Sequence, residues 1–207
     1  MMGNVEQKRR IITRDILDLE GVKPLVTSAD ISEAEEFKTE KRKCEYLTWR
    51  AVLRSALRDM GAEVSRYADT PILYRASGAP YIEGLPLWFG VSHSRDMVAV
   101  VISDERCAVD IETRDRRFEA IESRYLSAEE LAILEGAFGA DLGVGRAVAW
   151  SAKEAAYKYC QTEGLDFVRD MQIVGVDELR AEITVTAQNR RLKLSYEVHE
   201  KYVVVAV

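Results

Sequence analysis

The sequence predicts an α+β protein that is divided into two subdomains. A helix-then-strands order occurs twice along the 207 residues, and the second series begins near residue 90. No linker rich in Pro, Gly or Ser separates the two series, so we expect the subdomains to share an interface. We place the boundary between residues 90 and 91, which gives an N-terminal subdomain of 1–90 and a C-terminal subdomain of 91–207.

The N-terminal subdomain is predicted to begin with a long helix. Apolar residues recur near a 3.6-residue period over 32–60, with Ser32 and Glu35 as a capping box at the start and Gly61 after the end. Short apolar segments bounded by Pro and Gly then predict strands over 71–75, 80–83 and 86–91.

The C-terminal subdomain is predicted to begin with strands over 97–103 and 107–112, joined as a hairpin through 103–106. Ser127 and Glu130 form a second capping-box pattern, which opens a helix that runs to about residue 138. A further helix is expected over about 146–160. Alternating apolar residues then predict strands over 182–187, 192–199 and 202–207.

The composition is that of a globular protein, with 47% hydrophobic and 31% charged residues. The net charge of −6 argues against nucleic acid as a partner, because such binding favours a broad basic face. The longest apolar runs are too short to span a bilayer, and the N-terminus does not resemble a secretory signal. Cys44, Cys107 and Cys160 lie far apart without metal-ligand spacing, so we expect free thiols and a cytoplasmic protein.

Asp110 and Glu112 are the first candidates for a functional site. Residues two apart on a strand project to the same face, so the two carboxylates would lie side by side while Val109 and Ile111 face the core. Adjacent carboxylates repel each other, and a divalent cation compensates that repulsion well. The alternative is an exposed strand end at which the two acids form ordinary ion pairs with Arg114 and Arg116.

The predicted helix over 146–160 supplies a third carboxylate. Glu154 and Lys158 are four residues apart and share one helix face, while Lys153 points partly away from them. Carboxylates that hold Mg²⁺ beside lysines that contact phosphate oxygens are the usual arrangement for phosphoryl transfer. The alternative is a surface ion pair between Glu154 and Lys158, worth roughly 0.3–0.5 kcal/mol.

A histidine and a cluster of basic residues each have two explanations, one structural and one functional. His93, between Ser92 and Ser94, is either a structural or surface histidine or part of a phosphate site. A basic cluster on the N-terminal helix is interleaved with glutamates, and a solvated helix face explains it adequately. The cluster consists of Lys38, Lys41, Arg42 and Lys43.

The order and spacing of these segments resemble one family. The matching segments are 91–94 (Val-Ser-His-Ser), 109–112 (Val-Asp-Ile-Glu), 124–130 and 150–158 (Trp-Ser-Ala-Lys-Glu-Ala-Ala-Tyr-Lys). Together they resemble the 4′-phosphopantetheinyl transferases, and in particular the monomeric two-subdomain type that activates surfactin-like synthetases. The combination is more specific than any one of its segments.

The resemblance implies a pseudo-dimer of two similar α+β halves with the active site in the cleft between them. It also implies transfer of the 4′-phosphopantetheine group from coenzyme A to a serine of an acyl or peptidyl carrier protein. Adenosine 3′,5′-bisphosphate is the implied second product. Mg²⁺ is the implied cofactor, coenzyme A and the apo carrier protein are the implied partners, and the enzyme is expected to be a monomer.

The resemblance also implies roles for individual residues. Three carboxylates would hold Mg²⁺, namely Asp110, Glu112 and Glu154. Glu154 is the implied general base toward the serine hydroxyl, and Lys158 would neutralise charge that develops on the phosphate and the leaving group. The residues implied to contact coenzyme A are Ser92, His93, Lys153, Lys158, Arg75 and Arg42.

The chain departs from the family pattern at a turn that usually reads Gly-Lys-Pro and here is Gly78-Ala79-Pro80. A phosphate-binding lysine is therefore missing, and Arg75 is the candidate to replace it. This departure leaves a non-catalytic coenzyme A-binding relative as the alternative function. A metal-dependent phosphohydrolase is a further alternative, but the sequence lacks the His- or Asp-rich cluster of a dinuclear metal site.

Overall fold

A computed structural model describes residues 9–207 of the chain, and it contains both helices and antiparallel sheets, which confirms the predicted α+β class. The chain divides into two compact units. Of the described residues, the first unit contains 9–91 and Asp96–Cys107, and the second contains Ser92–Arg95 and Ala108–Val207. The pseudo-dimer arrangement of the two units stays a prediction.

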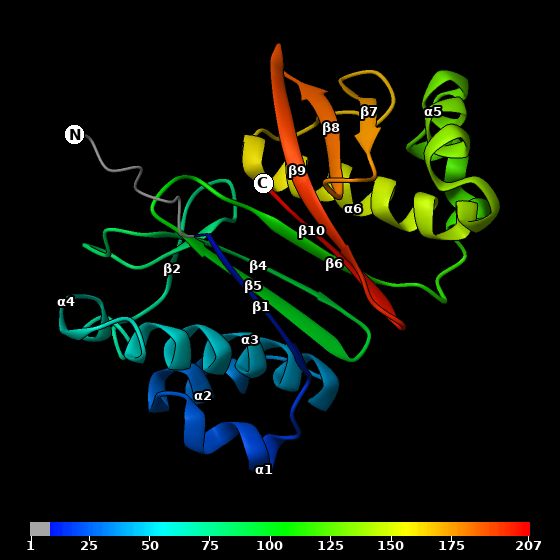
Figure 1. The fold of residues 1–207 in the computed structure, drawn as a ribbon. Helices are drawn as coiled ribbons and strands as arrows, with labels where there is room; N and C mark the ends of the chain where they lie inside the picture. Colours follow the sequence, from blue (N-terminus) through cyan, green and yellow to red (C-terminus); the bar gives the residue numbers. More distant parts are fainter. Residues whose placement is uncertain (1–8) are drawn as a thin grey trace, which may run out of the picture. The chain divides into compact units, whose positions relative to one another are not determined.

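The first unit is built on a three-stranded antiparallel sheet in the order β1-β5-β4 (Figure 1). Its central strand is β5 (Met97–Ser103), which pairs with β1 (Arg10–Asp15) and lies beside β4 (Trp88–Ser94). The predicted boundary at residue 90 therefore differs from the structure, because β5 completes the sheet of the first unit. The hairpin predicted through 103–106 is wrong for the same reason.

The helices of the first unit precede most of its sheet. They are α1 (Leu19–Val22), the 3₁₀ helix η1 (Lys23–Leu25), α2 (Ser28–Ala34), α3 (Glu40–Arg58) and α4 (Ala62–Ser65). The α3 helix packs against β5 through residues such as Leu53 and Leu57. A small hairpin of β2 (Leu73–Tyr74) and β3 (Pro80–Tyr81) completes the unit.

The single helix predicted over 32–60 is two helices in the structure. The capping box that opens α2 is formed by Thr27 and Asp30, not by Ser32 and Glu35. The Thr39 side chain then accepts a hydrogen bond from the Arg42 backbone N–H and starts α3. Each helix thus begins where a hydroxyl satisfies a free backbone N–H.

The second unit contains a five-stranded antiparallel sheet in the order β6-β10-β9-β8-β7. The β6 strand at one edge pairs with β10, so that Asp110 lies opposite Val205 and Glu112 opposite Val203. The strands are β6 (Val109–Thr113), β7 (Met171–Asp177), β8 (Glu182–Ala187), β9 (Arg190–Val198) and β10 (Tyr202–Ala206).

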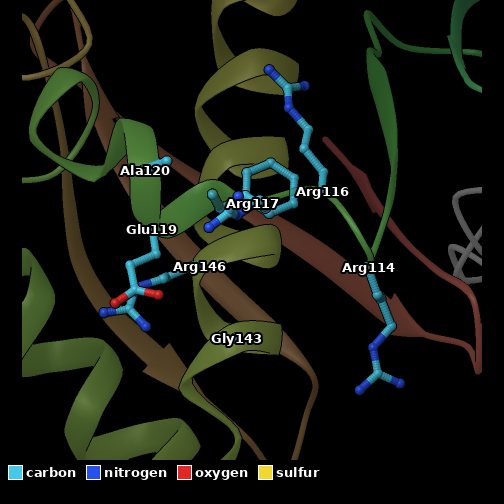
Figure 2. A pocket seen from close by; sticks show the side chains of 8 residues that line it. Arg114, Arg116, Arg117, Glu119, Ala120, Gly143 and Arg146 are labelled. Atoms are coloured by element: carbon cyan, nitrogen blue, oxygen red, sulfur yellow. The ribbon is translucent and has the colours of Figure 1, made fainter.

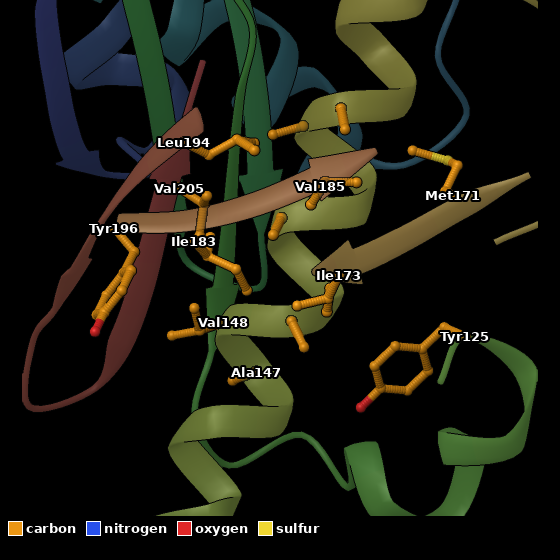
Figure 3. Packing of buried hydrophobic residues seen from close by; sticks show 14 of the residues in the cluster. Tyr125, Ala147, Val148, Met171, Ile173, Ile183, Val185, Leu194, Tyr196 and Val205 are labelled. Carbon is orange, nitrogen blue, oxygen red and sulfur yellow. The ribbon is translucent and has the colours of Figure 1, made fainter. Parts of the chain in front are cut away.

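Two helices pack on this sheet. The long α6 (Leu142–Cys160) contacts β6, β8, β9 and β10, and α5 (Ala128–Phe138) packs beside α6 and β7. Short side chains such as Ala147 and Val148 bring α6 close to Ile183 and Val205 of the sheet, as Figure 3 shows. The 3₁₀ helices η2 (Phe118–Arg124) and η3 (Gly139–Asp141) precede α5 and α6 respectively.

The start of α6 differs from the prediction. The helix begins at Leu142, because the Asp141 side chain accepts a hydrogen bond from the Val144 backbone N–H. Gly145 is part of the helix, and a Cβ there would lie 2.8 Å from Phe138 of α5. This glycine therefore permits close helix packing. The capping box predicted at Ser127 and Glu130 is confirmed.

None of the helices formed by residues 9–207 combines the length and the apolar character that a membrane crossing requires. Cys44, Cys107 and Cys160 are buried. Burial raises the pKa of the Cys107 thiol to about 12, so this thiol is a packing residue at neutral pH.

Candidate functional site

The carboxylates of β6 are placed by strand geometry and by helix α6. Asp110 and Glu112 are two residues apart on β6, and both are nearly buried. The α6 helix packs against this strand and brings Glu154 and Lys158 toward it. We refer to Asp110, Glu112, Glu154 and Lys158 as the carboxylate site.

Asp110 is held by a lysine and a serine. Its Oδ1 accepts hydrogen bonds from Lys158 Nζ at 2.7 Å and from Ser92 Oγ at 2.8 Å. Lys158 also donates to Ser92 Oγ at 3.0 Å and to the Val109 carbonyl oxygen at 3.3 Å. The other carboxylate oxygen, Oδ2, is buried without a hydrogen-bond partner among residues 9–207. A buried, unpaired carboxylate oxygen is costly, and a bound cation would relieve that cost.

Glu112 has three donors on its two oxygens. Its Oε1 accepts from Trp150 Nε1 at 3.0 Å and from the Arg116 guanidinium, and its Oε2 accepts from Ser94 Oγ at 2.6 Å. Burial raises the pKa of Glu112, and the charge of Asp110 adds to that effect. The three donors oppose the shift, because hydrogen bonds to an ionised carboxylate favour the charged form.

The charge of Glu154 interacts with those of both β6 carboxylates, Asp110 and Glu112. Burial raises its pKa, the charges of Asp110 and Glu112 raise it further, and the neighbouring Lys158 opposes them. A carboxyl group with a raised pKa is a stronger proton acceptor than a free glutamate. The site thus concentrates three acids around one lysine.

The donor set fits a divalent cation of the Mg²⁺ type. All three acids offer oxygen ligands, which Mg²⁺ prefers, and Oδ2 of Asp110 is available for one. As the side chains stand, no group of three His, Cys, Asp or Glu residues among 9–207 is close enough to hold a metal. Lys158 and Arg116 instead supply the positive charge, on Asp110 and Glu112 respectively.

Lys153 has its partners inside the second unit, and its predicted contact with coenzyme A has no support in the structure. Its side chain has no exposed surface, and its ammonium group lies 2.5 Å from Glu130 Oε1. It also donates to the carbonyl oxygens of Phe167 at 2.6 Å and Met171 at 3.0 Å. All three N–H donors are therefore used inside the second unit. Burial lowers the pKa of Lys153, and the pair with Glu130 opposes that shift.

The other residues expected to contact coenzyme A lie on exposed parts of the protein. His93 is exposed and lies between Ser92 and Ser94 on β4. In the first unit, Arg42 pairs with a glutamate of its own helix, and exposed Arg75 stacks over two aromatic rings. The structure thus brings Ser92 to the carboxylate site, and the roles of His93, Arg42 and Arg75 stay predictions.

Two residues that donate hydrogen bonds to Glu112 were missed as functional candidates. From the sequence, Trp150 was included only in the matching segment 150–158, and Arg116 only as a partner in an ordinary ion pair. Helical spacing could have indicated the first, because Trp150 is one turn before Glu154 on the same face of α6. The alternative interpretation was half right: Arg116 does pair with Glu112, whereas Arg114 pairs with Asp141.

Comparison with known proteins gives one family. Residues 106–207 match the family model of the 4′-phosphopantetheinyl transferase superfamily, and a search of curated proteins gives no match. The matched range contains β6 and α6 and therefore every member of the carboxylate site. Residues 106–207 of this chain, which form nearly all of its second unit, belong to the 4′-phosphopantetheinyl transferase superfamily.

Proposed function

We propose that this protein transfers the 4′-phosphopantetheine group of coenzyme A to a serine hydroxyl of an acyl or peptidyl carrier protein. Adenosine 3′,5′-bisphosphate is then the second product. The observation that carries the proposal is the carboxylate site, whose three acids and one lysine all lie inside the range that matches the superfamily. The proposal includes dependence on Mg²⁺, a monomeric enzyme and a cytoplasmic location.

In this proposal Lys158 neutralises the charge that develops on the phosphate oxygens. Its ammonium group is partly exposed and can turn from Asp110 toward a bound pyrophosphate. Once the ammonium group has turned toward the bound pyrophosphate, it needs no further reorganisation during the reaction, which makes such stabilisation effective. Ser92, which now bridges Lys158 and Asp110, is released for a phosphate contact by the same movement.

Glu154 is proposed as the general base. Its raised pKa increases its tendency to accept the proton of the attacking serine hydroxyl. Asp110, Glu112 and Glu154 together would hold Mg²⁺, which supplies charge neutralisation for the pyrophosphate when it is bound. His93, Arg42 and Arg75 complete the proposed coenzyme A contacts, with Arg75 in the role of the missing turn lysine.

The test is intact-mass analysis of an apo acyl carrier protein and an apo peptidyl carrier protein. Each is incubated with this protein, coenzyme A and Mg²⁺, with and without EDTA. We expect a gain of one phosphopantetheine that EDTA abolishes. No gain on either carrier, together with measurable coenzyme A binding, would instead establish the non-catalytic coenzyme A-binding alternative.

A further inference from the structure

Both oxygens of Glu112 already accept hydrogen bonds in the structure. Trp150 and Arg116 both donate to Oε1, and Ser94 donates to Oε2. Only one of these three donors carries a charge. A divalent cation at Glu112 would therefore lie beside the Arg116 guanidinium, and the two positive groups would repel each other.

We propose that Arg116 is a built-in competitor of the divalent cation at Glu112. In the metal-free protein the guanidinium neutralises Glu112, and metal binding requires it to leave. This inference rests on the proposed metal-binding role of Glu112. It adds a residue that sets the metal affinity of the site without contacting the substrate.

Arg116 can leave Glu112 at low cost. Its side chain is 41% exposed, and its guanidinium lies over the rings of Trp150 at 4.7 Å and Phe118 at 5.2 Å, contacts that contribute little free energy at exposed sites. Arg116 also lines an open pocket of about 420 Å³. Figure 2 shows its side chain directed away from those of Arg114 and Arg146, which line the same pocket. The departing guanidinium therefore moves into solvent and does not need to be buried.

Trp150 differs from Arg116 in this respect. Its ring packs against Tyr125 at 5.2 Å, Phe167 at 5.8 Å and Phe118 at 6.3 Å between centroids. An indole held by three rings cannot move without disturbing the core. Trp150 therefore keeps Glu112 oriented while Arg116 exchanges with the cation.

The experiment is a titration with Mn²⁺ at fixed pH near 8, in which free Mn²⁺ is followed by electron paramagnetic resonance. The wild type is compared with Arg116→Ala and with Arg117→Ala, which removes the same charge from the adjacent position. Arg117 lines the pocket but has no contact with Glu112 among the interactions of residues 9–207. Asp110→Ala serves to identify the site.

We expect Arg116→Ala to bind Mn²⁺ roughly three- to tenfold more tightly than the wild type, because one competing ion pair is removed. Arg117→Ala should stay within about twofold of the wild type, since its charge is screened by solvent. Unchanged or weaker binding by Arg116→Ala would overturn the inference, as would an equal gain in Arg117→Ala. Absence of Mn²⁺ binding in both the wild type and Arg116→Ala would also overturn it.

These outcomes are separate from those of the transfer assay. Tighter Mn²⁺ binding by Arg116→Ala, without any transfer to carrier proteins, would retain the competitor role and reject the proposed activity. Transfer by the wild type, without a change in Mn²⁺ affinity in Arg116→Ala, would retain the activity and reject the competitor role. Equal Mn²⁺ binding by Asp110→Ala and the wild type would reject the metal site on which the inference rests.

Discussion

The two units of the molecule use the same device to fix a long helix. Both α3 and α6 have 19 residues, and each is preceded by a shorter helix that opens with a capping box. In the first unit the box residue Asp30 binds Arg54 of α3 through two hydrogen bonds of 2.7 and 2.8 Å. In the second unit the box residue Glu130 binds Lys153 of α6 at 2.5 Å.

The units differ in what the rest of the long helix does. In α3 the second buried cation, Arg50, lies 3.2 Å from the same Asp30 and stacks over Tyr46, so it also serves structure. In α6 the second cation, Lys158, faces Asp110 on β6. A buried ion pair on the long helix is therefore common to both units. The second unit has further charged residues, the carboxylate site, and these are the candidates for function.

The largest effect is expected at the structural ion pair of the second unit. Lys153→Met should lower the free energy of unfolding by about 3–5 kcal/mol, because Glu130 stays buried without its partner. Urea unfolding measures this loss, and Glu130→Gln in the same chain should restore part of it. If the Lys153→Met protein is as stable as the wild type but fails to transfer phosphopantetheine, the result would instead support a contact between Lys153 and coenzyme A.

The second prediction concerns Asp110 of the carboxylate site. Asp110→Asn should lower the rate of transfer about a hundredfold or more, because a proposed metal ligand loses its charge. The free energy of unfolding should change by less than about 1 kcal/mol, since the substitution removes a buried charge whose Oδ2 is unpaired. Unchanged turnover at saturating Mg²⁺ would contradict the ligand assignment.

The third prediction asks whether the first unit contributes to substrate binding. Arg75→Ala should weaken coenzyme A binding roughly five- to tenfold, the effect of one exposed contact to a phosphate. Arg66→Ala is the matched control, because Arg66 is also exposed in the first unit and also stacks over a tyrosine, Tyr67. Calorimetry measures both affinities, and equal values for the two variants would remove Arg75 from the proposed site.

The smallest effect is expected in the pH dependence of the first unit. Burial would raise the pKa of Asp30, but hydrogen bonds from Arg54 and Thr27 outweigh it and hold the pKa below its ordinary value of 3.8. The carboxylate of Asp30 therefore binds a proton more readily in the unfolded state than in the folded state. Ionised Asp30 stabilises the fold above pH 3.8, and that contribution is lost as the pH falls through the lowered pKa.

Urea unfolding of the wild type and Asp30→Asn, from neutral pH to about pH 3, measures this loss. The difference in free energy of unfolding between the two proteins should be constant near neutral pH and should narrow below pH 3.8. A difference that stays constant down to the lowest pH would show that Asp30 does not titrate as its contacts indicate.

Local spacing explains what could be predicted from the sequence. The period of two on β6 and the spacing of four on α6 indicated four charged residues as candidates, and the family resemblance gave them a common role. The capping box at Ser127 was likewise visible, because its two members are three residues apart. Such features depend only on the geometry of a single helix or strand.

The features that could not be predicted depend on distant partners. Nothing near Lys153 in the sequence indicates that Glu130 and the chain at Phe167 and Met171 will enclose its ammonium group. The break between α2 and α3 contains neither Pro nor Gly, so the helical period continues across it. Likewise, β5 and β6 follow each other closely, but their pairing is decided by β1 and β10.

The position of β6 at the edge of its sheet has a consequence for biosynthesis. Its neighbour in that sheet is β10, which leaves the ribosome long after β6 has emerged. The nascent chain therefore carries Asp110 and Glu112 throughout the synthesis of residues 113–201 without the strand that aligns them. A message with a premature stop before Tyr202 would yield a product that has all the acidic side chains of the site but lacks β10, the strand that pairs with β6.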